Sequence, residues 1–76
     1  MKILENQIGQ TIEAAFWYRY DMDGKDYAVV QGTISRVIGC YNRILINVQK
    51  VVCGCYPNSY AWIDCNKADI EFLNTK

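Results

Sequence analysis

Residues that could carry out catalysis are scarce in this sequence. The 76 residues include no histidine, so the chain cannot build a Ser-His-Asp triad or a Cys-His pair. The stretch Asp21-Met22-Asp23-Gly24 resembles a calcium loop only in part, because the full pattern would put Arg19 at the first ligand and Val30 at the bidentate one. Asp-Gly between two apolar runs is instead typical of a hairpin turn. We expect no enzyme, since a hydrolase that uses Asp or Cys would lack a general base.

The four cysteines are the only residues that suggest a metal site. Structural zinc sites draw ligands in pairs about two to four residues apart, whereas Cys53-Gly54-Cys55 is a tighter pair and Cys40 and Cys65 stand alone. We therefore expect no metal and no cofactor, and interpret the cysteines as small packed residues. The first ten residues, MKILENQIGQ, have neither the apolar core of a signal peptide nor the length of a membrane span. This predicts a cytoplasmic protein with reduced cysteines and no membrane partner.

Size, composition and charge limit the kind of protein further. At 76 residues, of which 51% are apolar, the chain is expected to form a single domain over residues 1–76. A core of this size is near the lower limit for an unaided fold. Eight basic residues balance eight acidic ones, so the molecule has no overall field that attracts nucleic acid. Any anion site has to be local.

The elements that position the remaining candidates are predicted to be strands. Apolar residues near the N-terminus recur at helical intervals but are interrupted by Gly9, which predicts at most a short helix from about Lys2 to Gln7. From Thr11 the period changes to two, which indicates a strand that runs to the Asp-Gly turn. Four further strands are expected at Tyr27 to Ile38, Arg43 to Val52, Tyr60 to Cys65 and Ile70 to Leu73.

Two features of these strands indicate their arrangement. Gly32 lies inside the second strand, where the absence of a Cβ suits a sharp bend or bulge. The run Ile44-Leu45-Ile46 is apolar on both faces; strict alternation would bury Ile44, Ile46 and Val48 together. The pattern predicts a mainly β fold, a small five-stranded, strongly bent antiparallel barrel, closed or nearly closed, of Sm-like or SH3-like type.

The stretch Gly32 to Asn47 resembles the first sequence motif of the Sm/LSm family. Its glycine, apolar, asparagine and leucine positions are matched in register by Gly32, Ile34, Val37, Tyr41, Asn42, Leu45 and Asn47, while the usual Asp is replaced by Ile38. In that family the leucine is a core position, which conflicts with strict alternation at Leu45. The second motif lacks its Arg-Gly pair and is similar to the bacterial Hfq branch only at Lys67 and Ile70.

The resemblance implies a binding site for single-stranded RNA, or single-stranded DNA. In the family the loop between the second and third strands places an Asn against a base edge, and Asn42 matches that position. Cys40 stands where the family has a stacking residue, so Tyr41 is expected to stack on a base instead. Lys67 would add charge from the second corner, and we include the neighbouring Arg43 and Asn66 in the same predicted site. The family also implies a ring of identical subunits, with an interface at Tyr60, Trp62, Ile70 and Phe72.

Each of these residues also has an ordinary structural interpretation. Asn at a hairpin tip tolerates a left-handed backbone, Tyr41 could cover the end of the barrel, and Lys67 could be a solvated charge. The alternative function is an SH3-like protein-interaction module that binds a protein partner through the exposed aromatic residues Trp17, Trp62, Tyr18 and Tyr56. The neutral net charge favours this alternative. Convergence of Arg36, Arg43 and Lys67 on one concave surface near Asn42 would favour RNA.

Overall fold

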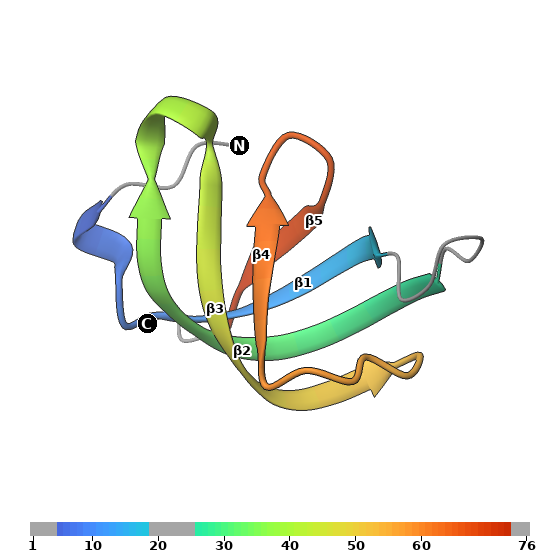
Figure 1. The fold of residues 1–76 in the computed structure, drawn as a ribbon. Coiled ribbons are helices and arrows are strands. Elements are labelled where there is room, and N and C mark those ends of the chain that lie inside the picture. Colours follow the sequence, from blue (N-terminus) through green and yellow to red (C-terminus); the bar gives the residue numbers. More distant parts are fainter. Residues whose placement is uncertain (1–4, 19–25, 74–76) are drawn as a thin grey trace.

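The computed structural model describes residues 5–18 and 26–73, and these residues form mainly β-structure (Figure 1). The predicted ranges of the second to fifth strands agree with the structure within one residue at each end. The predicted Asp-Gly turn and the strand residues beyond Tyr18 lie outside the described residues. The elements are η1 (Glu5–Gln7), β1 (Thr11–Tyr18), β2 (Asp26–Ile38), η2 (Gly39–Tyr41), β3 (Arg43–Cys53), β4 (Tyr60–Asp64) and β5 (Asp69–Phe72).

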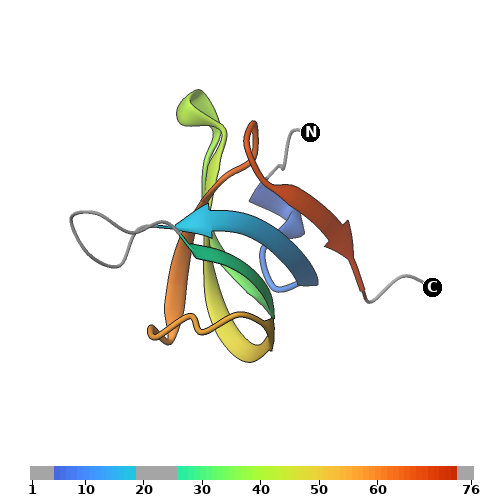
Figure 2. The same ribbon diagram turned by 90° about the vertical axis from the view of Figure 1, so that its right-hand side faces the viewer.

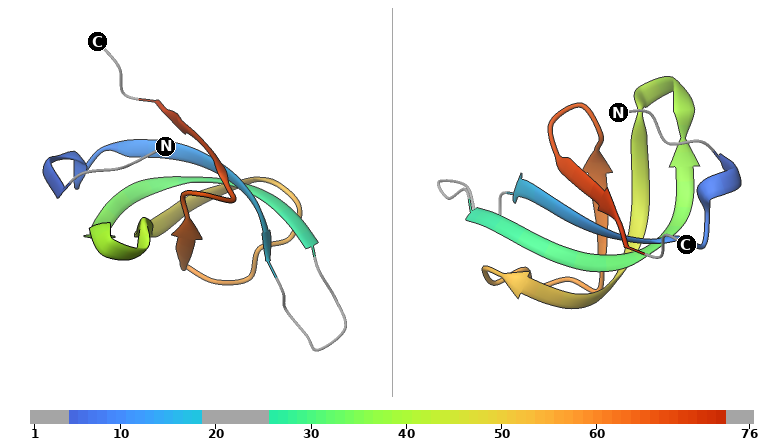
Figure 3. Two further views of the ribbon diagram at one scale, coloured as in Figure 1. Left: turned by 90° about the horizontal axis from the view of Figure 1, so that it is seen from above. Right: turned by 180° about the vertical axis from the view of Figure 1, so that it is seen from behind.

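The strands form one antiparallel sheet in the order β4-β3-β2-β1-β5. The strongly bent five-stranded sheet is confirmed, but the predicted closure into a barrel is wrong, because β4 and β5 are the two edges of this sheet. β5 has four residues and pairs only with Ile12 to Ala15 of β1. Figure 2 shows β4 and β5 on opposite sides of the molecule, joined by a short corner, and Figure 3 shows β5 lying along β1. Alternation predicts strands, but it does not determine whether the two outer strands meet.

The described part of the N-terminal segment does not form the predicted α-helix. Glu5–Gln7 is a single 3-10 turn, and Lys2 to Leu4 lie outside the described residues. Gly9 then adopts a φ of 97°, which ends the turn, and its N–H donates to the Ile34 carbonyl at 2.8 Å. The segment is thereby tied to the bend of β2. No helix in the described ranges is long and apolar enough to cross a membrane.

The inner face of the bent sheet forms the core. Strict alternation holds in β3, where Ile44 and Ile46 are fully buried and Leu45 is half-buried on the outer face. The family pattern expected Leu45 to be a core residue, whereas in this strand Leu45 follows the alternation and lies on the outer face. The buried apolar residues are Ile12, Ala14 and Phe16 of β1, Ala28, Val30 and Ile34 of β2, Ile44 and Ile46 of β3, Ala61 and Ile63 of β4, and Cys65.

Gly32 allows the sheet to bend as the sequence predicted. The pairing of β2 with β3 shifts register between Gln31 and Gly32, and Figure 1 shows both strands curving together. A Cβ at Gly32 would overlap the carbonyl oxygen of Asn47. Only glycine therefore permits this close approach of the two backbones.

Candidate nucleic-acid interface

The loop between β2 and β3 is a single tight turn with Asn42 at its end. Asn42 has φ 52° and ψ 46°, a left-handed conformation, and its N–H donates to the Gly39 carbonyl at 3.2 Å. It is the one non-glycine residue with positive φ in the described ranges. The ordinary interpretation of Asn at a hairpin tip is thus confirmed for its backbone, because asparagine tolerates this region better than most residues.

The side chain of Asn42 joins this turn to the corner between β4 and β5. Its Nδ2 donates to Oδ1 of Asn66 at 2.9 Å, although the two residues are 24 positions apart in the sequence. A backbone bond runs alongside, from the Cys65 N–H to the Asn42 carbonyl at 2.9 Å. Figure 1 shows the two loops at the same end of the molecule. The structure therefore brings together two of the residues predicted for one site.

Asp64 shapes the second corner so that Asn66 can reach Asn42. Its Oδ1 accepts the Asn66 N–H at 3.0 Å, and its carbonyl accepts the N–H groups of Lys67 and Ala68 at 2.9 and 3.0 Å. This is the local pattern of an Asx turn, in which a side chain replaces a backbone acceptor. Asp64 also lies opposite Arg43 in the register of β3 and β4.

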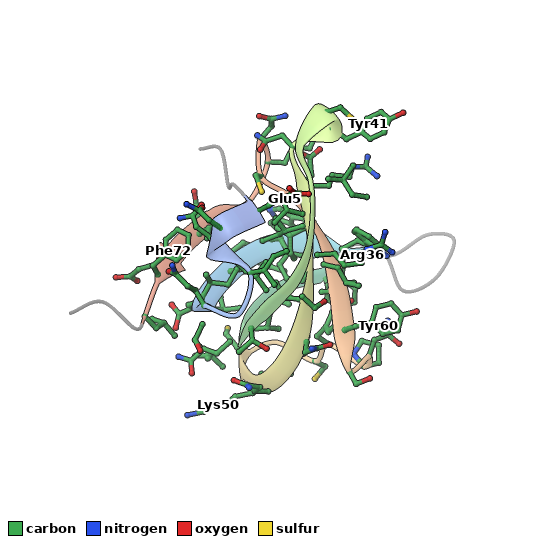
Figure 4. All side chains as sticks on the ribbon, turned by 90° about the vertical axis from the view of Figure 1, so that its left-hand side faces the viewer. Glu5, Arg36, Tyr41, Lys50, Tyr60 and Phe72 are labelled. Atoms are coloured by element: carbon green, nitrogen blue, oxygen red, sulfur yellow. The ribbon has the colours of Figure 1, made fainter. Side chains whose placement is uncertain are left out.

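Tyr41 points into solvent at the tip of the β2–β3 turn. Its side chain is 70% exposed and projects away from the sheet (Figure 4). It does not cover the end of the fold, which was its ordinary alternative. An exposed ring beside a hydrogen-bonded amide pair is chemically suited to stacking against a flat aromatic ligand.

Lys67 follows Asn66 in the second corner and lines a cleft between β4 and the end of β1. The cleft has a volume of about 600 Å³ and is lined by Phe16, Trp17, Trp62 and Ile63, with Asp64 and Lys67 as its charged groups. It lies beside the start of β5, because β5 begins at Asp69 opposite Ala15 and leaves Phe16 to Tyr18 of β1 without a β5 partner. Of the four aromatic residues predicted to be exposed for the alternative function, Trp17 and Trp62 are exposed and line this cleft. Tyr18 and Tyr56 are half-buried against the core, so the prediction is wrong for them.

The three basic residues that were to distinguish the functions do not converge on one concave surface. Arg36 and Arg43 lie on the outer face of the sheet, since their partners Leu45 and Asp64 lie outside the core. Lys67 lines the cleft instead. Arg43 adjoins Asn42 in the sequence, but the three cations are divided between the outer face and the cleft. The convergence that would have favoured RNA is therefore not found.

The four residues predicted for the subunit interface fall into two groups. Tyr60 and Trp62 are exposed on the outer face of β4. Ile70 and Phe72 are half-buried, lie opposite Ala14 and Ile12, and pack against the core of their own subunit. The side chains of the second group therefore face inward, and only their backbone groups are available to a neighbour.

The cysteine side chains differ mainly in burial. Cys65 is buried beneath the corner, as expected for a packed residue, whereas Cys40, Cys53 and Cys55 are exposed and the interpretation as packed residues is wrong for them. Burial raises the pKa of the Cys65 thiol above its usual value, and the nearby Asp64 carboxylate raises it further. No three metal-binding side chains lie together within the described ranges. Comparison with known protein families, curated proteins and solved structures finds no match to this chain.

Proposed function

We propose that the protein is a non-enzymatic, Sm-like RNA-binding protein that acts as a homo-oligomeric ring in RNA processing or regulation. The observation that carries the proposal is the amide pair of Asn42 and Asn66 next to the exposed ring of Tyr41. Amides offer both donors and acceptors to a base edge, and an aromatic ring stacks on any base. Such a site suits single-stranded RNA, or single-stranded DNA, because the bases are unstacked and accessible.

The local arrangement compensates for a net charge of zero. Arg43 follows Asn42 directly and its side chain is exposed, so a phosphate adjoining the bound base meets a guanidinium. Arg43 lies on the outer face whereas Lys67 lines the cleft, so we expect the two cations to contact different phosphates. Binding is then local, weak for one subunit, and dependent on salt.

Self-association is supported by the two open edges of the sheet. The Ser59 carbonyl accepts the Val48 N–H, and the Cys65 N–H donates to the Asn42 carbonyl. Every second residue from Ser59 to Cys65 therefore directs its backbone groups toward β3. The backbone N–H and carbonyl of Trp62, which lies between these residues, point to the open edge. By the same reasoning, the bond from Leu73 to Thr11 turns the backbone of Phe72 toward the open edge of β5. Pairing of β4 with β5 of a neighbour is head-to-tail, and a closed ring is one outcome of such a contact.

The RNA site is tested by anisotropy of labelled oligo(U) and oligo(A) at two salt concentrations. We expect Tyr41→Ala, Asn42→Gly and Asn66→Ala each to weaken binding about 5- to 50-fold, in line with the loss of one stacked base or one base-edge contact. Asn42→Gly is chosen because glycine keeps the left-handed backbone. Asn58→Gly, in the exposed loop at the other end, is the matched control. Equal binding by all variants would exclude this site.

The ring is tested by light scattering coupled to size exclusion. A mass near that of one 8.8 kDa chain at micromolar concentration would contradict it. Trp62→Pro removes both the indole ring and the backbone N–H at the open edge of β4. Trp62→Ala is its control, because it removes the indole ring but keeps the backbone N–H. We expect only the proline variant to dissociate. Phe72→Asp is a poor probe, because Phe72 packs against the core of its own subunit.

A second candidate function, an SH3-like protein-interaction module, is favoured by the cleft beside β4. Both tryptophans of the chain line it, and its volume is in the range of ligand sites. Aromatic-lined grooves of this kind bind extended proline-rich peptides. Trp17→Ala would abolish binding of such a peptide and leave the tip intact, so a peptide library read out by tryptophan fluorescence separates the two functions.

A further inference from the structure

One face of the sheet combines exposed aromatic and basic side chains in a regular pattern. It is the outer face of β2, β3 and β4, from the row next to the Tyr41 turn to the row that contains Tyr60 at the start of β4. We call it the outer platform. The register aligns its side chains across the three strands in rows. These rows are Ile38, Arg43 and Asp64, then Arg36, Leu45 and Trp62, then Thr33, Asn47 and Tyr60.

A β-bulge places Arg36 on this platform. The pairing of β2 with β3 shifts between Ile34 and Arg36, so Ser35 is the extra residue, and its hydroxyl donates to the Leu45 carbonyl at 3.2 Å. Without the bulge, strict alternation from buried Ile34 would turn Arg36 toward the core. With it, Arg36 lies opposite Leu45 on the outer face, and Val37 lies opposite buried Ile44. The extra residue thus re-aims one charged side chain.

The platform side chains are accessible. Tyr60 is 53% exposed, Trp62 is 45% exposed, and Figure 4 shows Tyr41, Arg36 and Tyr60 projecting to the same side. Within residues 5–18 and 26–73, neither Arg36 nor Arg43 is held in an ion pair. Asp64 is the one carboxylate in the three rows, and its Oδ1 accepts the Asn66 N–H.

These dimensions suit a short single strand of nucleic acid. Arg43 and Asn47 are about 13 Å apart along β3, and Arg36 and Trp62 are about 10 Å apart across it, from the usual strand rise and spacing. Cations that follow a backbone, interleaved with aromatic faces on which bases stack, are the common chemistry of single-stranded nucleic-acid surfaces. The face carries two guanidiniums and one carboxylate, which favours an anionic ligand over a cationic one.

We propose that the outer platform extends the RNA site, so that a strand bound at Tyr41 and Asn42 continues across the sheet, with phosphates on Arg43 and Arg36 and bases on Trp62 and Tyr60. This inference rests on the proposed RNA-binding function. It assigns Trp62 and Tyr60 a ligand contact through their side chains. Their backbone groups face the open edge of β4, so strand pairing with a neighbour leaves the platform accessible.

The test is anisotropy of labelled oligo(U) of increasing length with matched variants. Arg36→Ala is expected to weaken binding of long but not of very short RNA, and to lower the salt slope by about 0.7, the value for one phosphate contact on a single strand. Lys50→Ala is its control, because Figure 4 shows Lys50 at the opposite end from Tyr41. Trp62→Ala is expected to weaken binding about 5- to 100-fold through the loss of a stacked base. Trp17→Ala, which alters the cleft but not the platform, is its control.

A second readout follows the platform directly. In a Trp17→Phe background Trp62 is the sole tryptophan, and RNA bound on the platform is expected to quench its fluorescence. If Tyr41 and Asn42 variants lose binding while Arg36→Ala and Trp62→Ala bind like the parent, the platform is wrong and the proposed function stands. If the parent binds no RNA, both fail. If a proline-rich peptide then quenches the tryptophan fluorescence of the parent protein, in which Trp17 is intact, the peptide-binding function replaces both proposals.

Discussion

The two ends of the sheet hold their loops by different physical means. At the end opposite Tyr41, the loop between β3 and β4 is held by rings: Tyr56 contacts Phe16 and Tyr18 edge-to-face at centroid distances of 5.6 and 5.0 Å. The Tyr56 hydroxyl donates to the Tyr60 carbonyl at 2.8 Å, and that of Tyr18 donates to the Cys55 carbonyl. At the end near Tyr41, an exposed amide pair joins the two loops.

This difference separates stability from binding. Aromatic rings that pack against the core contribute through apolar burial, and their hydroxyls are already used by backbone carbonyls. An exposed hydrogen bond between two amides contributes little, because water competes for both groups. The aromatic end is therefore expected to stabilise the fold, and the amide end is the one that can change partners when a ligand arrives.

The largest expected effect is on stability at the aromatic end. Tyr56→Ala removes two ring contacts and one hydrogen bond, and should lower the free energy of unfolding by about 2 to 3 kcal/mol. Tyr56→Phe keeps the ring and should cost about 1 kcal/mol. Denaturant unfolding measures both. RNA affinity of the folded variants should equal that of the parent, and a loss of affinity would break the separation of the two ends.

A smaller effect on stability is expected at the amide end. Asn66→Ala and Asn42→Gly should each lower the free energy of unfolding by about 0.5 kcal/mol, because the bond they remove is exposed. Asn42→Ala should cost about 1 kcal/mol more than Asn42→Gly, since alanine is strained at a φ of 52°. Unfolding curves and RNA titrations of the same samples give both quantities. A loss above 2 kcal/mol for Asn66→Ala would mean that this end is structural.

The sequence predicts the strands well because their signals are local. Each signal is visible within a few residues: the alternation from Thr11, the bend at Gly32 and the polar corners. Together they predict the strand ranges and the burial of Ile44 and Ile46 in β3. The bulge at Ser35 is not visible in this way. The sequence implies it only indirectly, because strict alternation without a bulge would place the charged side chain of Arg36 in the core.

Contacts between distant segments could not be predicted by such signals. The bond between Asn42 and Asn66 depends on how Asp64 turns the second corner. The cleft depends on where β5 begins, because its first residue pairs with Ala15 and leaves Phe16 unpaired on that side. Closure of the barrel failed for the same reason, because periodicity is a property of one strand and closure is a property of the whole sheet. The sequence therefore identified candidate residues for the site, but it did not show which of them lie together, such as Asn42 with Asn66.

The smallest expected effect concerns Cys65, the buried residue beneath the amide end. Its backbone N–H donates to the Asn42 carbonyl, and its side chain is part of the core below the corner that carries Asn66. Because burial raises the pKa of its thiol in the folded state, the folded protein holds this proton more tightly than the unfolded chain does. The resulting stability is complete below the usual thiol pKa of 9.0 and is lost as the pH rises through the higher folded value.

We therefore expect the free energy of unfolding to fall more steeply above about pH 9 in the parent than in Cys65→Ala. Tyrosines and lysines titrate in the same range, so the difference between the two unfolding profiles isolates Cys65. Cys53→Ser, at an exposed thiol, is the control and should leave the parent profile unchanged. If the free energy of unfolding changes with pH in the same way for the parent and for Cys65→Ala, the folded protein does not hold the Cys65 thiol proton more tightly than the unfolded chain. In that case the buried thiol of Cys65 makes no pH-dependent contribution to stability, and the amide end has no buried part that differs in this way from its exposed tip.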